Sequence, residues 1–388
     1  MQIAPRLVAC VALLCLGSSP VFGQGQLWIV DKAGGPGFDF TEIQPAVDAA
    51  ANGDTVLVRS GSYPGFTIDG KSLVVTRDGA SPSATGFTVI GLAAGQEVTV
   101  RGMNVTTCTL ELNDGPVWLE SVTVLSEPFF FSSPSVRVQA CSAVIAARCS
   151  FTSGGFFFAD PGLNALSSNL YLFETTAQGT SFPWATGTLG GPGGDGVKLT
   201  DSFLFASGCT FKGGKGATGG ACSPGGTGGS GLVCIGGPVP QLLETALVGG
   251  TGGCGVDCGG CGPTGQPAVG GYDLVAGFAR DYTLASPATG GQTTTLSYSG
   301  KAGDVVFSLI GLSQSALYLP ALAGSLVLPI PPLLISHGAA DGAGQLQVSV
   351  QLPPLPPGIE AFTVYAQSAA ISAVGAAVLG APSQLSIL

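Results

Sequence analysis

The first regular pattern of apolar and polar residues lies in the segment 39–50, which reads DFTEIQPAVDAA. Pro45 stands near its start, where proline is tolerated in a helix. The residues NGD then end the pattern, and TVLV begins a strand. This spacing of apolar residues is that of one helix face, and it predicts a single short helix before the β-structure. The apolar residues are Ile43, Ala46, Val47 and Ala50.

A string of short strands, separated by turns, follows this helix. Several strands end in one motif, in which two inward-type residues flank a third residue, usually polar, and a turn follows. Such a motif predicts a solenoid, whose coils share one strand scaffold while their loops vary in length. We align six pairs: Met103/Val105, Val122/Val124, Cys149/Phe151, Thr175/Ala177, Cys209/Phe211 and Thr245/Leu247.

The pattern changes near Tyr272 to strands of alternating apolar and polar residues, such as TTTLSYSG and GQLQVSVQLP. Turn residues separate these strands at short intervals, and LPPLPPG marks a proline-rich connection. We predict a small antiparallel β-sandwich over residues 272–388.

Composition narrows the class of protein. Only 9% of the residues are charged, 63 are glycine and 45% are hydrophobic, which is enough to bury a core. The net charge of −10 argues against a nucleic-acid partner, because phosphates require a basic surface.

The N-terminal residues 1–23 have the features of a secretory signal peptide. Arg6 supplies positive charge, residues 7–16 are apolar, and a small residue, Gly23, ends the segment. No later stretch offers about 18 uninterrupted apolar residues, so we expect no transmembrane segment in the mature chain. The expected location is therefore extracellular or on the cell surface.

The opening DFTEIQPAVDAA…GDTVLVRSGSY resembles the N-terminal cap and first coil of right-handed parallel β-helix proteins, the pectin lyase-like superfamily. The resemblance implies an all-β fold in which a short helix caps a solenoid over residues 27–271. Glycine-rich loops at about 186–262 would interrupt its later coils. The C-terminal sandwich is similar to β-modules of many exported bacterial proteins.

The catalytic motifs of pectinesterase-type members are incomplete. Gly61 and Tyr63 are followed by Gly65 where that family has glutamate, so Tyr63 is expected to stack inside a coil. Polygalacturonase-type hydrolysis needs clustered carboxylates, yet no two aspartates are adjacent. The only histidine, His337, lies in ISHGAADG, where we expect a solvated loop.

Lyase chemistry leaves one pair to consider. Pectate lyases use Ca²⁺ held by acidic groups, with an arginine that takes the α-proton. Arg101 and Glu120 would face each other if they occupy matching positions on neighbouring coils, either as a catalytic pair or as a surface ion pair.

A second site for Ca²⁺ is suggested by the run GGPGGDGVK at 190–198. It matches one copy of a calcium-binding nonapeptide repeat, with Asp195 in the key position. Consecutive copies are needed to share each ion, so the alternative is a flexible loop.

The cysteines suggest disulfides or a metal site. Cys254, Cys258 and Cys261 lie close together in GGCGVDCGGCG, where they form either a metal knuckle or disulfides with Cys222 or Cys234. Two other cysteines at equivalent repeat positions, Cys149 and Cys209, are expected to stack as buried thiols.

Two runs of three phenylalanines offer a binding surface. Alternate residues of a strand point outward, so each run should expose an aromatic ring unless a loop covers it. An exposed patch would contact a partner or a sugar ring, while a covered one would form a satellite core. The candidates are Phe129, Phe131, Phe156 and Phe158.

These observations favour an exported, non-catalytic structural or binding protein whose partner is a polysaccharide or an extracellular-matrix or cell-surface component. The alternative is a carbohydrate-active enzyme, a polysaccharide lyase or an esterase-like protein with a rearranged site. An enzyme needs an acidic cluster with arginine or lysine in a groove along one sheet, whereas a scaffold would present a neutral face rich in Ser, Thr and Val.

Overall fold

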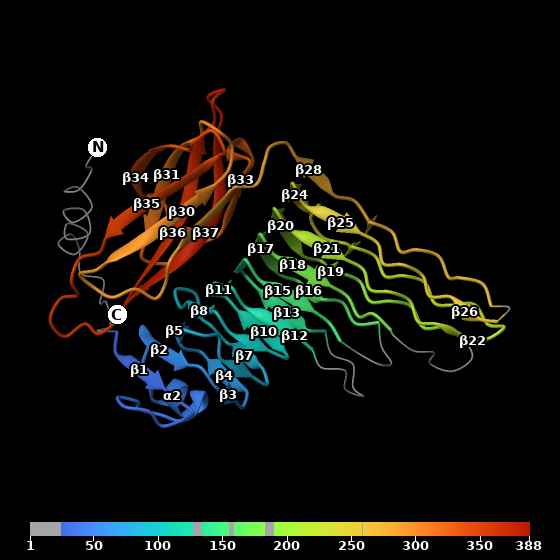
Figure 1. Cartoon of the computed structure of the whole chain (residues 1–388), viewed down its shortest axis with the longest axis horizontal. Coiled ribbons are helices and arrows are strands. Elements are labelled where there is room, and N and C mark those ends of the chain that lie inside the picture. Colours follow the sequence, from blue (N-terminus) through green and yellow to red (C-terminus); the bar gives the residue numbers. More distant parts are fainter. Residues whose placement is uncertain (1–24, 127–133, 155–158, 183–189, 258) are drawn as a thin grey trace.

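The computed structural model describes residues 25–126, 134–154, 159–182, 190–257 and 259–388. Three long parallel sheets form a β-helix in which successive coils contribute one strand to each sheet (Figure 1). Sheet A contains β1 (Leu27–Val30), β2 (Asp54–Arg59), β5 (Leu73–Asp78), β8 (Val98–Arg101), β11 (Val117–Glu120), β14 (Val144–Ala147), β17 (Asn169–Phe173), β20 (Phe203–Ser207), β24 (Gln241–Leu243) and β28 (Asp273–Val275).

The other two sheets have eight strands each. Sheet B contains β3 (Ser62–Tyr63), β6 (Ser83–Ala84), β9 (Asn104–Val105), β12 (Thr123–Leu125), β15 (Ser150–Thr152), β18 (Thr176–Gln178), β21 (Thr210–Lys212) and β25 (Ala246–Val248). Sheet C contains β4 (Phe66–Asp69), β7 (Phe87–Ile90), β10 (Cys108–Asn113), β13 (Val136–Cys141), β16 (Leu163–Leu166), β19 (Val197–Thr200), β23 (Leu232–Ile235) and β27 (Ala268–Val269).

The register of sheet B confirms the predicted repeat alignment. One inward column contains, in the order of the coils, Val105, Val124, Phe151, Ala177, Phe211 and Leu247. Stacking one apolar residue on the next at every coil removes the column from water, which is the main source of the solenoid's stability.

The predicted helix and the stacked tyrosine are both present. Helix α2 (Ile43–Ala49) buries Ile43, Ala46 and Val47 against the core at the end of the solenoid that begins with β1. Tyr63 is buried above Ala84, and its hydroxyl donates to the Arg59 carbonyl at 2.9 Å.

The C-terminal residues form the predicted antiparallel sandwich, but its first strand begins at Asp281, because residues 273–275 form β28 of sheet A rather than part of the sandwich. A three-stranded sheet contains β29 (Asp281–Leu284), β30 (Thr293–Ser299) and β35 (Gln345–Gln351), and a four-stranded sheet contains β34 (Leu333–Ala339), β31 (Val305–Gly311), β36 (Phe362–Ile371) and β37 (Ala377–Ile387). The short strands β32 (Leu317–Leu319) and β33 (Gly324–Leu326), joined by the 3₁₀ turn η1 (Pro320–Leu322), pair separately.

The four-stranded sheet lies between the three-stranded sheet and the outer face of sheet A. Trp118 and Phe205 of the β-helix share one buried cluster with Leu309, Tyr365 and Leu379 of the sandwich. The Trp118 and Tyr365 ring centroids are 5.2 Å apart. The sandwich therefore covers part of the sheet A face that would otherwise be exposed.

The glycine-rich segments form a two-layered extension, which we call the glycine lobe: residues 179–182, 190–196, 213–231, 249–257 and 259–267. Its outgoing segments continue sheet B and its returning segments lead into sheet C, and Figure 1 shows them extending away from the sandwich toward β22 (Gly219–Ala221) and β26 (Gly255–Val256).

Hydrogen bonds join the two layers of the glycine lobe in a zigzag. The amide of Gly214 donates to Gly194, that of Gly229 to Gly214, and that of Gly250 to Gly229, at 2.7–2.9 Å between nitrogen and oxygen. The amides that donate from one layer to the other recur every third position, as at Gly226 and Gly229, which is the period of an extended polyproline II-like chain. The expectation of a flexible loop is wrong for these residues, because their backbone groups are paired.

Candidate functional site

The outer face of sheet B carries an aligned row of small polar side chains. Each coil places one residue in register with the next, between the two inward residues of the repeat motif. We call this the hydroxyl row: Ser62, Ser83, Asn104, Thr123, Ser150, Thr176 and Thr210.

Most of the hydroxyl row is available for contact with a ligand. Strand pairing sets its members about 4.8 Å apart along the solenoid. The side-chain hydroxyls of Thr123, Ser150, Thr176 and Thr210 form no hydrogen bond with the described part of the chain, and all four residues are at least partly exposed. Each free hydroxyl can both donate and accept a hydrogen bond.

The face around the row is nearly uncharged. The strands of sheet B contain no Asp or Glu, and Lys212 is their one charged residue. Charges lie instead on sheet C, where Arg137 and Glu111 form an exposed pair at 3.2 Å. The described strands of this face can therefore hydrogen-bond a neutral polar polymer.

The repeat motif of the sequence already contains the residues of the hydroxyl row. Each copy of the motif has one residue, usually polar, between two inward residues. The parallel register of sheet B aligns these middle residues into one continuous outward row. In the sequence the motif indicates the solenoid, but only the strand register shows that the flanked residues form one surface.

Arg101 and Glu120 occupy matching positions on β8 and β11, with Nε and Oε1 3.5 Å apart. They do not lie at the surface, because the sandwich covers them: Glu120 is 1% exposed. Its carboxylate accepts hydrogen bonds from the Ser383 hydroxyl at 2.9 Å and the Gln384 amide at 2.7 Å.

A second arginine completes this buried cluster. Arg148 contacts Glu120 at 2.7 Å and Asp281 at 3.2 Å, and it donates to the carbonyl of Tyr282. Burial alone would raise the pKa of Glu120, but Arg148 and Arg101 hold that pKa below its ordinary value. The carboxylate is therefore ionised and paired, and it forms a structural contact between the β-helix and the sandwich.

Asp195 lies in the glycine lobe, where its side chain accepts a hydrogen bond of 2.9 Å from the Ser230 amide. Burial raises the pKa of Asp195, which weakens its suitability as a cation ligand. Across the described ranges, no three His, Cys, Asp or Glu residues are grouped to hold a metal ion.

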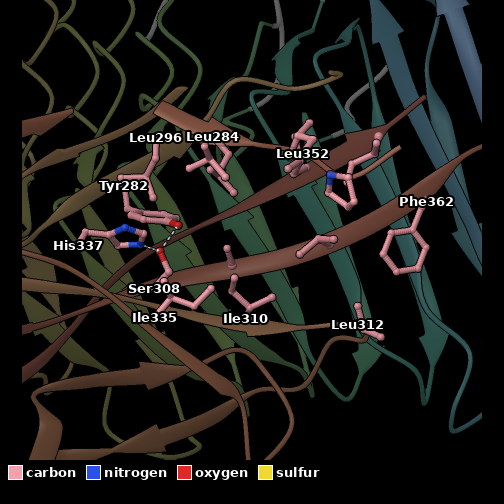
Figure 2. A pocket seen from close by; sticks show the side chains of 16 residues that line it. Tyr282, Leu284, Leu296, Ser308, Ile310, Leu312, Ile335, His337, Leu352 and Phe362 are labelled. Atoms are coloured by element: carbon pink, nitrogen blue, oxygen red, sulfur yellow. Dashed lines mark hydrogen bonds between the residues drawn. The ribbon is translucent and has the colours of Figure 1, made fainter. Parts of the chain in front are cut away.

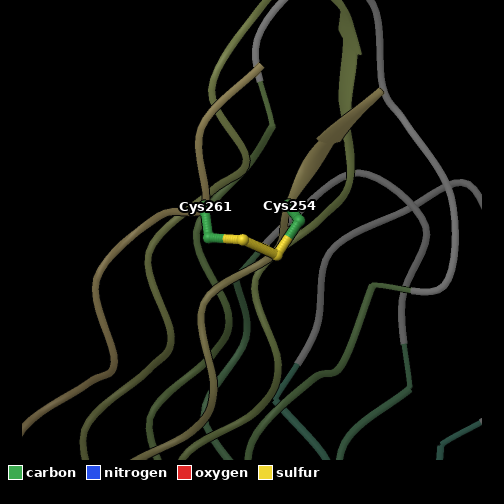
Figure 3. Close-up of a disulfide and its surroundings, with 2 residues drawn as sticks. All are labelled: Cys254 and Cys261. Carbon is green, nitrogen blue, oxygen red and sulfur yellow. A yellow bond between two sulfur atoms is a disulfide. The ribbon is translucent and has the colours of Figure 1, made fainter. Parts of the chain in front are cut away.

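Cys254 and Cys261 form a disulfide that joins an outgoing to a returning segment of the glycine lobe (Figure 3). Cys222 is also disulfide-bonded. Cys258 lies outside the described residues. Cys149 and Cys209 are free and buried, as predicted.

The prediction of a disulfide at Cys234 is wrong. Cys234 is a free thiol on β23, paired in register with Leu199 and packed against the solenoid core. Its strand position keeps it within sheet C rather than in the glycine lobe, where Cys254 and Cys261 lie.

Other sequence-based candidates fall elsewhere. The signal segment 1–23 and the phenylalanines at 129, 131, 156 and 158 lie outside the described residues. His337 was expected in a loop, but it lies half-buried on β34, and its Nε2 is 2.7 Å from the Ser308 hydroxyl. No described helix is long and apolar enough to cross a membrane.

No protein-family model and no curated protein matches this chain. Among solved structures, it is similar to the enzymatically active domain of tailspike protein 2 of bacteriophage CBA120, with a TM-score of 0.25 and 11% identity over 92% of this chain and 72% of that one. It is also similar to full-length tailspike protein 2 from an Escherichia coli O157:H7 bacteriophage, with a TM-score of 0.27 and 10% identity over 93% of this chain and 68% of that one. The fold assignment rests on the sheet topology.

Proposed function

We propose that this protein is an exported, non-catalytic scaffold that binds a neutral polysaccharide along the hydroxyl row of sheet B. The observation that carries the proposal is the row itself, with in-register polar residues and four hydroxyls that have no hydrogen-bond partner in the described part of the chain. A sugar chain presents hydroxyls that pair with such groups in either direction.

The shape of the row favours an extended ligand. Its members follow the solenoid axis over seven coils, so a chain of sugar units can contact several members at once. Each contact is worth only about 1 kcal/mol, since it replaces hydrogen bonds to water. Useful affinity therefore requires many contacts in series, which a polymer supplies and a single sugar does not.

The location of the charged residues favours binding over catalysis. The Arg101–Glu120 pair is covered by the sandwich, and the Glu120 carboxylate is hydrogen-bonded to it, so a substrate has no access to the pair. On sheet C the carboxylates Asp69 and Glu111 lie two strands apart, and Glu111 is paired with Arg137, whereas lyase and hydrolase sites need acidic groups that converge on one ion or bond.

Export is part of the same proposal. The Cys254–Cys261 disulfide suits an oxidising compartment, where such bonds persist. The protein would be secreted or held on the cell surface, with a polysaccharide of the surface or of the surrounding matrix as its partner.

Retention on immobilised neutral and acidic polysaccharides tests the binding step. The double variant Thr123→Glu and Thr176→Glu places carboxylates in the row. It should abolish retention on the neutral ligand, because binding would remove water from two charges that have no partner. The matched variant Thr88→Glu and Asn164→Glu, on the outer face of sheet C, should bind as the unaltered protein does. Equal loss in both variants, or retention on acidic glycans alone, would contradict the proposed site.

Catalysis is measured on the same samples, with calcium and with chelator. Ultraviolet absorbance of unsaturated products, released reducing ends and released methanol should stay at background. Calcium-dependent formation of unsaturated product would replace the scaffold with a polysaccharide lyase.

A further inference from the structure

The C-terminal sandwich contains a cavity of about 70 Å³ between its two sheets. Figure 2 shows the lining side chains spread along one direction, from Tyr282 and His337 at one end to Leu312 and Phe362 at the other. The walls between these ends are aliphatic side chains of both sheets, including Leu296 and Ile310. The cavity is therefore elongated and apolar.

Its three polar groups satisfy one another. The Tyr282 hydroxyl is 2.6 Å from the Ser308 hydroxyl, which lies 2.7 Å from Nε2 of His337. Burial lowers the pKa of His337, so the imidazole is neutral at neutral pH. No other titratable side chain lines the cavity, which leaves its wall uncharged.

This trio does not form a hydrolytic site. A serine nucleophile needs a base oriented by a third group and donors for the developing oxyanion. Here the Ser308 hydroxyl is held between Tyr282 and His337, and no carboxylate lines the cavity to orient the imidazole. Ser308 also lies within the continuous strand β31, whose backbone groups pair with neighbouring strands. The cavity is suited to binding rather than acyl transfer.

The cavity has an entrance between the edge strands of the two sheets. Strand β34 is at the edge of the four-stranded sheet and β35 at the edge of the three-stranded sheet. Their lining residues Ile335 and Val350 are half-exposed, whereas Tyr282 on β29, at the opposite edge, and Leu296 on the central strand β30 are buried. A ligand can thus enter from this side while its remainder stays in water.

We propose that this cavity binds one unbranched alkyl chain, with the polar head of the amphiphile left outside between β34 and β35. An elongated apolar cavity favours a linear hydrocarbon, because burial of each methylene is favourable and no internal group can pair with a charge. The alkyl chain comes either from a soluble amphiphile or from a membrane lipid. This site is separate from the hydroxyl row, so the two proposals stand or fall independently.

Calorimetric titration of the full chain with n-alkyl glucosides, kept below their micelle-forming concentrations, tests the site. We expect one ligand per chain and an affinity that rises roughly fourfold for each added methylene until the cavity is full. Glucose, which has the same head group, should not bind there. Absence of dependence on chain length would overturn the proposal.

Two substitutions on one strand separate this site from general hydrophobic binding. Val350 lines the cavity and Val348 does not, although both are half-exposed on the same face of β35. Val350→Phe should fill the cavity and reduce affinity at least tenfold, while Val348→Phe should leave it unchanged. Equal affinity of the two folded variants would refute the assignment.

Flotation with phosphatidylcholine vesicles identifies the source of the alkyl chain. Vesicle binding that Val350→Phe abolishes would support a lipid ligand, and binding of the soluble glucoside without vesicle binding would support a free amphiphile. Absence of binding to either ligand would overturn the proposal.

Discussion

The Glu120 carboxylate, on strand β11 of the β-helix, accepts a hydrogen bond of 2.7 Å from the backbone amide of Gln384 on strand β37. These residues are 264 positions apart in the chain. The same carboxylate is paired with Arg148 at 2.7 Å. A single buried charge therefore links the β-helix to the sandwich, where it is the counter-ion of Arg101 and shares Arg148 with Asp281.

Glu120→Gln should destabilise this contact by about 3–5 kcal/mol, because removing one partner of a buried ion pair leaves the other charge uncompensated. Urea unfolding followed by far-ultraviolet circular dichroism measures the change, with the transition of each module fitted separately. The control is Glu111→Gln, which breaks the exposed pair with Arg137 and should cost less than about 1 kcal/mol. Similar losses in both variants would show that burial is not the cause.

Stability should fall as the pH rises from about 5 to 7.5. Burial raises the pKa of Glu97 from 4.5 to about 7, while the Gln314 amide partly offsets this effect. Between these values the folded protein binds more protons than the unfolded chain, so the free energy of unfolding decreases with pH, by at most about 3 kcal/mol for this group.

The matched variant for the pH effect is Glu97→Gln. It should flatten the pH dependence of unfolding, and Glu97→Gln with Glu174→Gln should flatten it further, since burial also raises the pKa of Glu174 to about 7. Glu120 acts in the opposite direction: its lowered pKa makes it stabilising above about pH 4.5 and less so as the pH falls below that value. An unaltered slope in the double variant would exclude these carboxyls as the source.

Phe151→Ala should cost about 3–5 kcal/mol, because it opens a cavity in the inward column between Val124 and Ala177. The adjacent Ser150 points outward, so Ser150→Ala should change stability by less than about 0.5 kcal/mol. Chemical denaturation of both variants measures the difference, which also tests the register of sheet B.

The solenoid could be predicted from sequence because its repeat is local. Each coil carries its own pair of inward residues, so the column follows from short stretches. Gly65 replaces the glutamate of the family motif near Tyr63, so the structural role of that tyrosine also follows from a short stretch. Similarly, Cys149 and Cys209 were expected to be buried because they occupy equivalent repeat positions.

Features that depend on distant segments could not be predicted in this way. The sequence suggested that Arg101 and Glu120 would face each other if their coils were in register, but it did not show that the sandwich covers both. His337 was assigned to a loop because ISHGAADG is rich in turn residues, whereas pairing with β31 extends β34 through it. The glycine-rich segments have no apolar pattern, and their order comes from backbone pairing across several coils.

Gly229→Ala should disrupt the glycine lobe. A Cβ atom at Gly229 would lie 1.9 Å from the carbonyl oxygen of Gly194, and no flexible side chain can move aside to make room. Gly229 is not in the left-handed region, so the requirement for glycine is close backbone packing rather than conformation. We expect a loss of about 1–3 kcal/mol or more.

Gly260→Ala is the matched control, because the structure places no atom within 4 Å of its added Cβ. Amide hydrogen exchange should show faster exchange at Gly214 and Gly250 in Gly229→Ala, since their hydrogen bonds join the same zigzag, and no change in Gly260→Ala. Sheet A amides serve as an internal reference and should exchange alike in both. If Gly229→Ala leaves the protection of the glycine lobe intact, the two layers are not held by this backbone packing, and the lobe would have to derive its order from the disulfide between Cys254 and Cys261 instead.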